Sequence, residues 1–268
     1  MRIAVAVLVF LVVPSAAVAQ SVIGLLGIAR EIAPIEQRLQ DVREVTVKGY
    51  VFRLGMLNGR QVVVGRSGVG KVSAAIVTTL LINQFSPSAI LFSGTAGAID
   101  PSLRQGDVVI GISVAHHDAG MQTADGIRRQ GNRNPLTGIF DPLLVPAPEP
   151  LLALARQAAQ TLRLPAVRTP DGKEQTPRIV EGVIVTGDVF LSDDARRIEL
   201  RKALGATAVE MEGAAVVQTC RQFSVPCLVV RSITDRADGQ AMSNYEQFLA
   251  TASENAAALV MAVVAGLK

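Results

Sequence analysis

The sequence predicts a single α/β domain in which helices cover both faces of a central, largely buried sheet. Apolar runs with the length of strands alternate with helical patterns through most of the 268 residues, which is typical of this class. The strand-like runs are continuous in Val, Ile, Leu and other apolar residues, as in "AILF" at 89–92, and such runs are expected where both faces of a strand are buried. The length suits one large domain with a substantial core, and we find no internal repeat or linker that divides it.

Turn and cap signals place the predicted elements along the chain. The dipeptide Asn58-Gly59 is the strongest turn signal and predicts a hairpin, while Pro150 and Ser192 mark the starts of two helices. The predicted strands, with the hairpin in the second segment, span residues 21–29, 44–67, 88–94, 106–118, 178–188, 206–211 and 225–235. The predicted helices span residues 30–40, 71–85, 148–164, 192–204, 212–223 and 243–267. Residues 119–148 lack such patterns and are rich in Gly, Pro, Asn and Arg, so we expect a long functional or interfacial excursion there.

The first twenty residues differ from the rest and have the pattern of an export signal. Arg2 is followed by an apolar run over residues 3–13, which is too short to cross a bilayer as a helix. The sequence "AVA" at 17–19 provides a small-x-small cleavage site. We therefore expect residues 1–19 to be a signal peptide, residues 20–268 to be the mature domain, and the protein to be periplasmic or secreted. The alternative is a buried first strand or helix.

Composition and charge argue against several classes of function. The formal net charge is only +3, the basic side chains are scattered, and eight Phe, two Tyr and no Trp offer few stacking surfaces, so no nucleic-acid partner is expected. No membrane partner is expected after removal of the signal. Neither His116 nor His117 has metal-ligand spacing with Cys220 or Cys227, so no metal or other cofactor is predicted. Buried free thiols are the preferred interpretation of the two cysteines, although export would permit a disulfide.

Polar residues follow the predicted strands at the positions where an α/β sheet binds ligands. In open sheets of this class, ligands collect at the carboxyl ends of the strands. The residues at or just after those ends are Glu31, Thr95-Ala96-Gly97, Asp118, Asp188-Val189-Phe190, Glu210-Met211-Glu212 and Thr234-Asp235. Because a carboxylate in an apolar run is either paired or used, we expect one site that is rich in acids and poor in cations.

A glycine-rich segment, "GRSGVGKVS" at 65–73, nearly matches the phosphate-binding loop G-x-x-x-x-G-K-[ST]. It follows a strand and opens a helix, as that motif requires. However, Val72 stands where the magnesium-binding hydroxyl should be, and Ser73 comes one place late. We therefore interpret the segment as a tight glycine turn with backbone N–H groups at a helix start.

Five blocks occur in order along the mature chain: "IGLLG" with a following Glu, "SGVGKVSAA", "FSGTAGAIDPSLRQGDVV", "VTGDVFL" and "VEMEGAAVVQTCRQFSVPCLVVRSITDRAD". They resemble the nucleoside phosphorylase/nucleosidase superfamily, and most of all its methylthioadenosine/S-adenosylhomocysteine nucleosidases. The resemblance implies a three-layer α/β/α domain with a central mixed sheet, a homodimer, and hydrolysis of the N-glycosidic bond of a purine nucleoside. Residues 119–178 match poorly, and we expect them to shape the subunit contact and the 5′ side of the ligand.

The resemblance assigns the reacting groups to the ends of the last two strands. Asp235, in "RSITD", corresponds to the family's catalytic acid, with Thr234 where the family has Ser, and Met211 with Glu212 corresponds to the ribose-binding pair. The chemistry requires these types, because breaking the C1′–N9 bond builds positive charge on the ribose and negative charge on the purine. The alternative for Glu212 is an acid that only favours a helix N-terminus.

Further roles follow from the same resemblance. Phe190 corresponds to the aromatic residue that stacks on the base, although a Phe in such a place is often part of the core. Thr95, Ala96 and Gly97 correspond to a loop that approaches sugar and base through its backbone. Glu31 corresponds to the residue that holds the attacking water, but it comes one residue early and requires a one-residue deletion in the turn.

For Glu210 we expect a structural pairing with an arginine, and Arg231 is the candidate; the alternative is that Arg231 orients the water.

Two other functions stay open at this stage. A purine nucleoside phosphorylase would need several arginines around phosphate, and Arg30 and Arg66 are the candidates, yet the turn "GIAREIAP" presents a Glu and favours water as the nucleophile. An exported nucleoside-binding or storage protein without turnover is the other alternative. The preferred hypothesis is hydrolysis of adenine-type nucleosides such as methylthioadenosine or S-adenosylhomocysteine, and export suits the salvage of external nucleosides.

Overall fold

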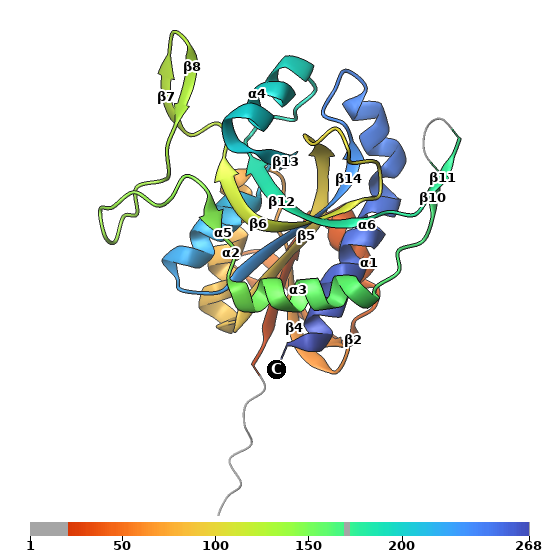
Figure 1. Ribbon diagram of the computed structural model, residues 1–268. Coiled ribbons are helices and arrows are strands. Elements are labelled where there is room, and N and C mark those ends of the chain that lie inside the picture. Colours follow the sequence, from red (N-terminus) through yellow and green to blue (C-terminus); the bar gives the residue numbers. More distant parts are fainter. Residues whose placement is uncertain (1–20, 169–171, 268) are drawn as a thin grey trace, which may run out of the picture.

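A mixed sheet organises the part of the chain that the structure, a computed structural model, describes: residues 21–168 and 172–267 (Figure 1). The predicted signal peptide, residues 1–19, lies outside the described residues. The main strands are β1 (Ile23–Gly27), β2 (Gln40–Val47), β3 (Tyr50–Leu57), β4 (Arg60–Arg66), β5 (Ala89–Ala98), β6 (Val108–His116), β12 (Ile179–Thr186), β13 (Ala206–Glu210) and β14 (Cys227–Asp235). Neighbouring strands follow the order β13–β12–β6–β14–β5–β1–β4–β3–β2, and both parallel and antiparallel pairs occur.

Helices cover both faces of this sheet, which confirms the expected α/β/α layers. One layer consists of α1 (Ala29–Glu36), α3 (Glu149–Thr161) and α6 (Ala241–Gly266), and the other of α2 (Lys71–Phe85) and α5 (Gly213–Gln222). The helix α4 (Asp194–Leu204) packs beside β13. Consecutive residues of β1 point to different layers, because Leu25 belongs to the core under α6 while Leu26 belongs to the core under α2 and α5. The strands are therefore buried on both sides, as their continuous apolar runs predict.

The last helix, α6, is apolar because it lies in the core. Its 26 residues would suffice to cross a membrane by length and composition, with a mean hydropathy of 1.6, but 61% of its most apolar window is buried inside the fold. Ala256, Leu259 and Val263 pack with residues of α1, α3 and the sheet. The long apolar pattern therefore reflects packing against two helices and the sheet.

The sheet curls until one edge meets its interior. The strand β13 pairs with β12 in parallel, and it also pairs with the end of β5 in an antiparallel sense, with Ala208 opposite Ala98 and Val209 opposite Gly97. Register shifts on either side of Val183 accompany this bend. The closure brings the segment after β13 beside residues 95–97, although more than a hundred residues separate them in the chain.

The excursion between β6 and β12 contains small elements outside the main path. The strands β7 (Gly120–Thr123) and β8 (Gly126–Arg129) form a hairpin that projects from the body of the domain (Figure 1). The strand β9 (Val145–Pro146) pairs with β6, and β10 (Val167–Arg168) pairs with β11 (Glu174–Gln175). The absence of a sequence pattern here corresponds to short pieces with few buried positions.

Three local predictions have clear outcomes. The hairpin at Asn58-Gly59 is confirmed, since β3 and β4 pair on either side of it. Cys220 and Cys227 are buried free thiols, which confirms the interpretation preferred over a disulfide. The prediction that Ser192 caps α4 is wrong: the Asp193 side chain accepts the Arg196 N–H at 2.6 Å, while the Ser192 hydroxyl donates to the carbonyl of Asp238.

The bend at Gly182 gives a test of the closure. A Cβ at this position would overlap the side chain of Thr207 on β13, and no flexible side-chain tip is available to yield. We expect Gly182→Ala to lower the free energy of unfolding by about 1–3 kcal/mol, the usual cost of overpacking. Gly239→Ala, at a glycine with open space around it, is the matched control and should change stability far less in the same urea titration. Equal effects of the two substitutions would contradict the proposed close approach.

Candidate active site

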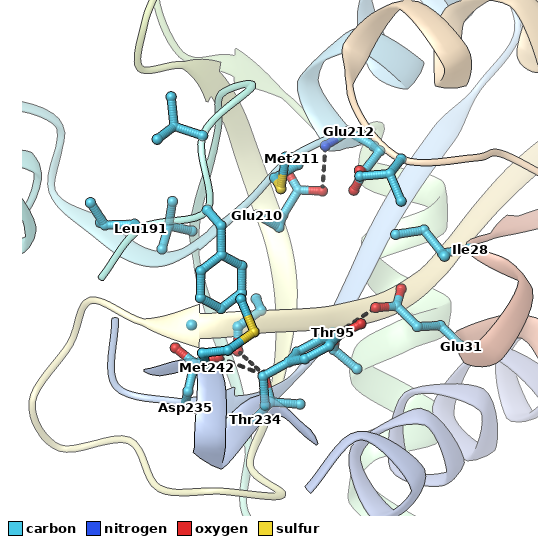
Figure 2. A pocket seen from close by; sticks show the side chains of 17 residues that line it. Ile28, Glu31, Thr95, Leu191, Glu210, Met211, Glu212, Thr234, Asp235 and Met242 are labelled. Carbon is cyan, nitrogen blue, oxygen red and sulfur yellow. Dashed lines mark hydrogen bonds between the residues drawn. The ribbon is translucent and has the colours of Figure 1, made fainter. Parts of the chain in front are cut away.

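A cavity lies at the carboxyl ends of β5, β13 and β14 and is bordered by the start of α1 and by α6 (Figure 2). Its volume is about 170 Å³, which is room for a small organic ligand, since one water needs only about 10–15 Å³. The residues that the resemblance assigns to the site all line it: Glu31, Thr95, Ala96, Gly97, Phe190, Met211, Glu212, Thr234 and Asp235. Asp118 and Asp188, which also follow strand ends, do not line it. The structure therefore brings together residues from five separate segments of the chain.

Asp235 presents a buried carboxyl group at the end of β14. Its Oδ2 accepts a hydrogen bond from the Thr234 hydroxyl at 2.8 Å, and its Oδ1 accepts one from the Ala237 N–H at 2.8 Å. Burial raises the pKa of Asp235 above its ordinary value, although these two hydrogen bonds oppose the shift. Gly97 lies directly beside it, because a Cβ there would be 2.8 Å from Oδ1. The carboxyl group is suited to hold a proton at a pH where an exposed Asp would be ionised.

Glu212 approaches the cavity from another side, at the start of α5. In Figure 2 its carboxylate lies across the cavity from Asp235. It occupies the N-cap position but makes no capping hydrogen bond, so an acid that only favours the helix start is not a sufficient explanation. One of its oxygens accepts the Gly70 N–H at 2.7 Å. Burial, followed by the charge of Glu210, raises the pKa of Glu212 to about 8.

Glu210 forms the structural pair that the sequence predicts. Its Oε2 accepts hydrogen bonds from Arg231 Nη2 at 2.6 Å and from the N–H groups of Glu212 and Gly213 at 3.1 and 2.7 Å. The Thr186 hydroxyl also donates to this carboxylate. Glu210 thus caps α5 in place of Glu212 and is fully occupied. Arg231 is the only buried Lys or Arg in the described part of the chain.

Glu31 points into the cavity despite its position one residue early. The helix α1 begins at Ala29, and Glu31 in its first turn is only 4% exposed. Its Oε1 accepts the Thr95 hydroxyl at 2.5 Å (Figure 2). Burial raises the pKa of Glu31, while the charge of Arg231 and the hydrogen bond from Thr95 act in the opposite direction. A shorter turn after β1 therefore still delivers this carboxyl group to the site.

The remaining wall of the cavity is apolar, and sequence reasoning missed most of it. Phe190 is 36% exposed and its ring meets that of Tyr245 edge to face, with centroids 5.9 Å apart, so it is not an ordinary core residue. The wall residues that were not predicted are Ile28, Val69, Leu191, Val209, Met242 and Tyr245. Most of them belong to turns or to the first turns of α6, where a pattern of apolar residues gives no sign of which side chains face a ligand.

The site is suited to cleave a bond whose rupture leaves negative charge on one fragment of the ligand and positive charge on the other. An acid that holds its proton lies on one side, and carboxylates suited to a cation lie on the other. No group of three or more His, Cys, Asp or Glu side chains with the arrangement of a metal site is found within residues 21–168 and 172–267.

Comparison with known proteins identifies the class. The phosphorylase superfamily matches residues 22–265, and the chain belongs to this superfamily. Within it, the chain is 38% identical over 249 residues to the 5′-methylthioadenosine/S-adenosylhomocysteine nucleosidase of Marinomonas sp. (strain MWYL1), covering 92% of this chain and 99% of that protein.

Solved structures agree with that relationship. The nucleosidase of the same name from Neisseria meningitidis, in complex with methylthio-immucillin-A, superposes with a TM-score of 0.79 at 31% identity, covering 92% of this chain and all of that one. Futalosine hydrolase of Helicobacter pylori strain 26695 superposes with a TM-score of 0.77, also at 31% identity, covering 92% of this chain and 98% of that one. The fold thus accommodates hydrolases with more than one named substrate.

Glu212→Gln tests the raised pKa through stability. Gln keeps an oxygen for the Gly70 N–H but cannot ionise. Because folding raises the pKa of Glu212 from 4.5 to about 8, the wild type loses stability as the pH rises through that interval, and the variant does not. We expect the variant to gain in unfolding free energy relative to wild type between about pH 4.5 and 8, and to keep that gain at about pH 9.

Glu36→Gln is the matched control for the sign of this effect. Although burial opposes ionisation, hydrogen bonds from Arg66 and Arg53 lower the pKa of Glu36. Its stabilising contribution is present at high pH and is lost as the pH falls through the folded pKa, so this variant should be less stable than wild type at about pH 9. A Glu212→Gln variant that is likewise less stable than wild type at about pH 9 would contradict a raised pKa at that position.

Proposed function

We propose that this protein hydrolyses the N-glycosidic bond of adenine nucleosides such as methylthioadenosine or S-adenosylhomocysteine, releasing free adenine and a ribose derivative. The observation that carries this proposal is that Asp235 and Glu212 line the same cavity from opposite sides. This is the arrangement that a departing purine and a cationic sugar require. Membership of the phosphorylase superfamily and the similarity to nucleosidases support the reaction class.

The proposed chemistry uses the protein's own carboxyl groups. As the C1′–N9 bond breaks, its electron pair goes to the purine, and protonated Asp235 donates a proton to N7 of the leaving base. Glu212 stabilises the positive charge on the sugar through the ribose hydroxyls. Water then attacks C1′, and Glu31 accepts its proton. Phe190 packs against the base, while residues 95–97 approach it through the backbone.

Water is favoured over phosphate as the nucleophile. The arginines that a phosphate site would need are engaged with carboxylates: Arg30 with Glu246 at 3.2 Å, and Arg66 with Glu36 at 2.7 Å. Arg231 is likewise held by Glu210 at 2.6 Å. A phosphate entering here would face the carboxylate of Glu31 and would have to displace one of these ion pairs.

Asp235→Asn tests turnover against simple binding. Asparagine keeps the shape but cannot donate the proton, so we expect adenine release to fall by about 10²–10⁴-fold while the nucleoside still binds. The assay measures free base from a panel of adenine nucleosides, with and without phosphate, and wild-type turnover should not require phosphate. Asp238→Asn, three residues on and outside the cavity lining, is the control and should keep most activity. Wild-type binding without any release of base would favour a storage protein.

We also propose a homodimer that forms through the layer of α2 and α5. Support comes from exposed apolar side chains there, since Val72 is 70%, Ile76 42% and Phe223 42% exposed, and exposed apolar surface of this kind commonly mediates association. We expect Val72→Asp to shift the molar mass in light scattering from dimer to monomer. Ile198→Asp, at an apolar side chain of α4 that is 61% exposed, should leave the dimer intact. A monomeric wild type would contradict the proposal.

Export is a further proposal, which rests on the sequence of residues 1–19. We expect the chain expressed in a bacterial host to be recovered from the periplasm with its mature N-terminus at about residue 20. Retention of the full N-terminus in the cytoplasm would contradict it.

A further inference from the structure

The segment that resembles a phosphate loop, residues 65–73, binds carboxylates of the protein itself. Gly70 has a φ of +86°, and α2 begins at the next residue without a side-chain cap. The first N–H groups of a helix are unpaired and favour an anion. In this structure the Gly70 N–H donates to Glu212 at 2.7 Å, and the Lys71 N–H donates to Asp188 at 2.8 Å. The place of a phosphate is therefore filled from within the chain.

Lys71, Asp118 and Asp188 form a cluster that we call the clamp. Lys71 Nζ lies 2.8 Å from both carboxylate oxygens of Asp118 and 3.7 Å from Asp188 Oδ2. The Asp188 N–H in turn donates to Asp118 at 3.0 Å. Although burial opposes ionisation, the hydrogen bond from Lys71 lowers the pKa of Asp118, which favours the charged carboxylate beside Lys71. The clamp joins the start of α2 to the segments that follow β6 and β12.

The clamp adjoins the turn that provides the hydrogen bond to the Glu212 side chain. In the described part of the chain, the Glu212 side chain accepts from Gly70 alone. The backbone of Gly70 lies close to Asp188, because a Cβ at this position would be only 3.0 Å from Asp188 Oδ1. The backbone N–H of Lys71, next to Gly70, also donates to Asp188, so the clamp and this turn share a hydrogen bond. Misplacement of a reacting group by about 1 Å can cost about 10²-fold in rate.

We propose that Lys71 and Asp118 are positioning residues that hold the Gly70 amide on Glu212, and thereby aim the carboxylate that faces the sugar. The inference rests on the proposed function. Neither residue lines the cavity, so both act through the turn and not on the substrate.

Two ligands separate positioning from general stability. Free adenine has no sugar and does not meet Glu212. A non-hydrolysable adenine nucleoside analogue with a protonated amine in the sugar ring does. For Lys71→Met and for Asp118→Asn we expect calorimetry to show the cationic analogue weakened about tenfold or more, with adenine changed by less than about threefold. Turnover should fall in parallel with binding of the cationic analogue. The double variant should be no worse than the poorer single variant, because both changes break one clamp.

Arg178→Met is the matched control. Arg178 and Asp107 form an ion pair of 3.1 Å just before the first residues of β12 and β6, whereas the clamp lies after the last residues of the same two strands. It should alter thermal stability without changing the ratio of the two affinities. Equal weakening of both ligands by the clamp variants, or a result like that of Arg178→Met, would overturn the positioning role. If one variant does not fold, the other still decides. A wild type that binds neither ligand and releases no base would instead contradict the proposed function.

Discussion

One buried ion pair, between Arg231 and Glu210, sets the shape of the whole site. The guanidinium group is 1% exposed, lies 4.0 Å from the centre of the Phe92 ring, and donates to Glu210 at 2.6 Å. The same carboxylate caps α5, so the helix, the end of β13 and the placement of Glu212 all depend on it. Removing one member of such a pair leaves an uncompensated buried charge at a cost of about 3–5 kcal/mol.

The pair also leaves the other carboxyl groups of the site without a free buried cation. Arg231 is committed to Glu210, and in the described part of the chain no second buried cation is available to Glu31, Glu212 or Asp235. Burial raises the pKa of all three, and the charge of Arg231 offsets only part of the shift at Glu31 and Glu212. This shortage of positive charge suits both reacting groups. It keeps a proton on Asp235 until the base departs, and it makes the ionised form of Glu212 favourable only when positive charge develops on the sugar. The same shortage leaves a phosphate anion without a partner.

Much of the fold was predictable because burial on two faces is visible in continuous apolar strands such as residues 89–92. The end of the first helix was not: α1 ends at Glu36, whereas the pattern suggested residue 40, and Gln40 already begins β2. The pairing of β13 with β5 was also invisible, because it joins distant segments through a bend at Gly182. Long-range pairing of this kind leaves no local period in the sequence.

The carboxyl groups of the site were predictable, since acids in apolar runs stand out and the family motifs surround them. Spacing alone could not decide whether the Glu31 side chain faces the cavity. The length of the turn after β1 does not determine the direction in which the first side chains of α1 point. The contribution of Gly70 was hidden for another reason: it acts through its backbone N–H, and every residue type except Pro has one. Tyr245 and Met242 were missed because apolar residues at a helix start are common whether or not a ligand lies beside them.

The most direct test of the central claim is a crystal structure of the mature protein with a non-hydrolysable adenine nucleoside analogue. The account predicts the analogue in the cavity of Figure 2, with a carboxyl oxygen of Asp235 within about 2.6–3.2 Å of N7 and the Glu212 carboxylate within the same distance of the ribose hydroxyls. An analogue bound with either carboxyl group out of reach of its partner atom, or bound elsewhere on the protein, would contradict the account.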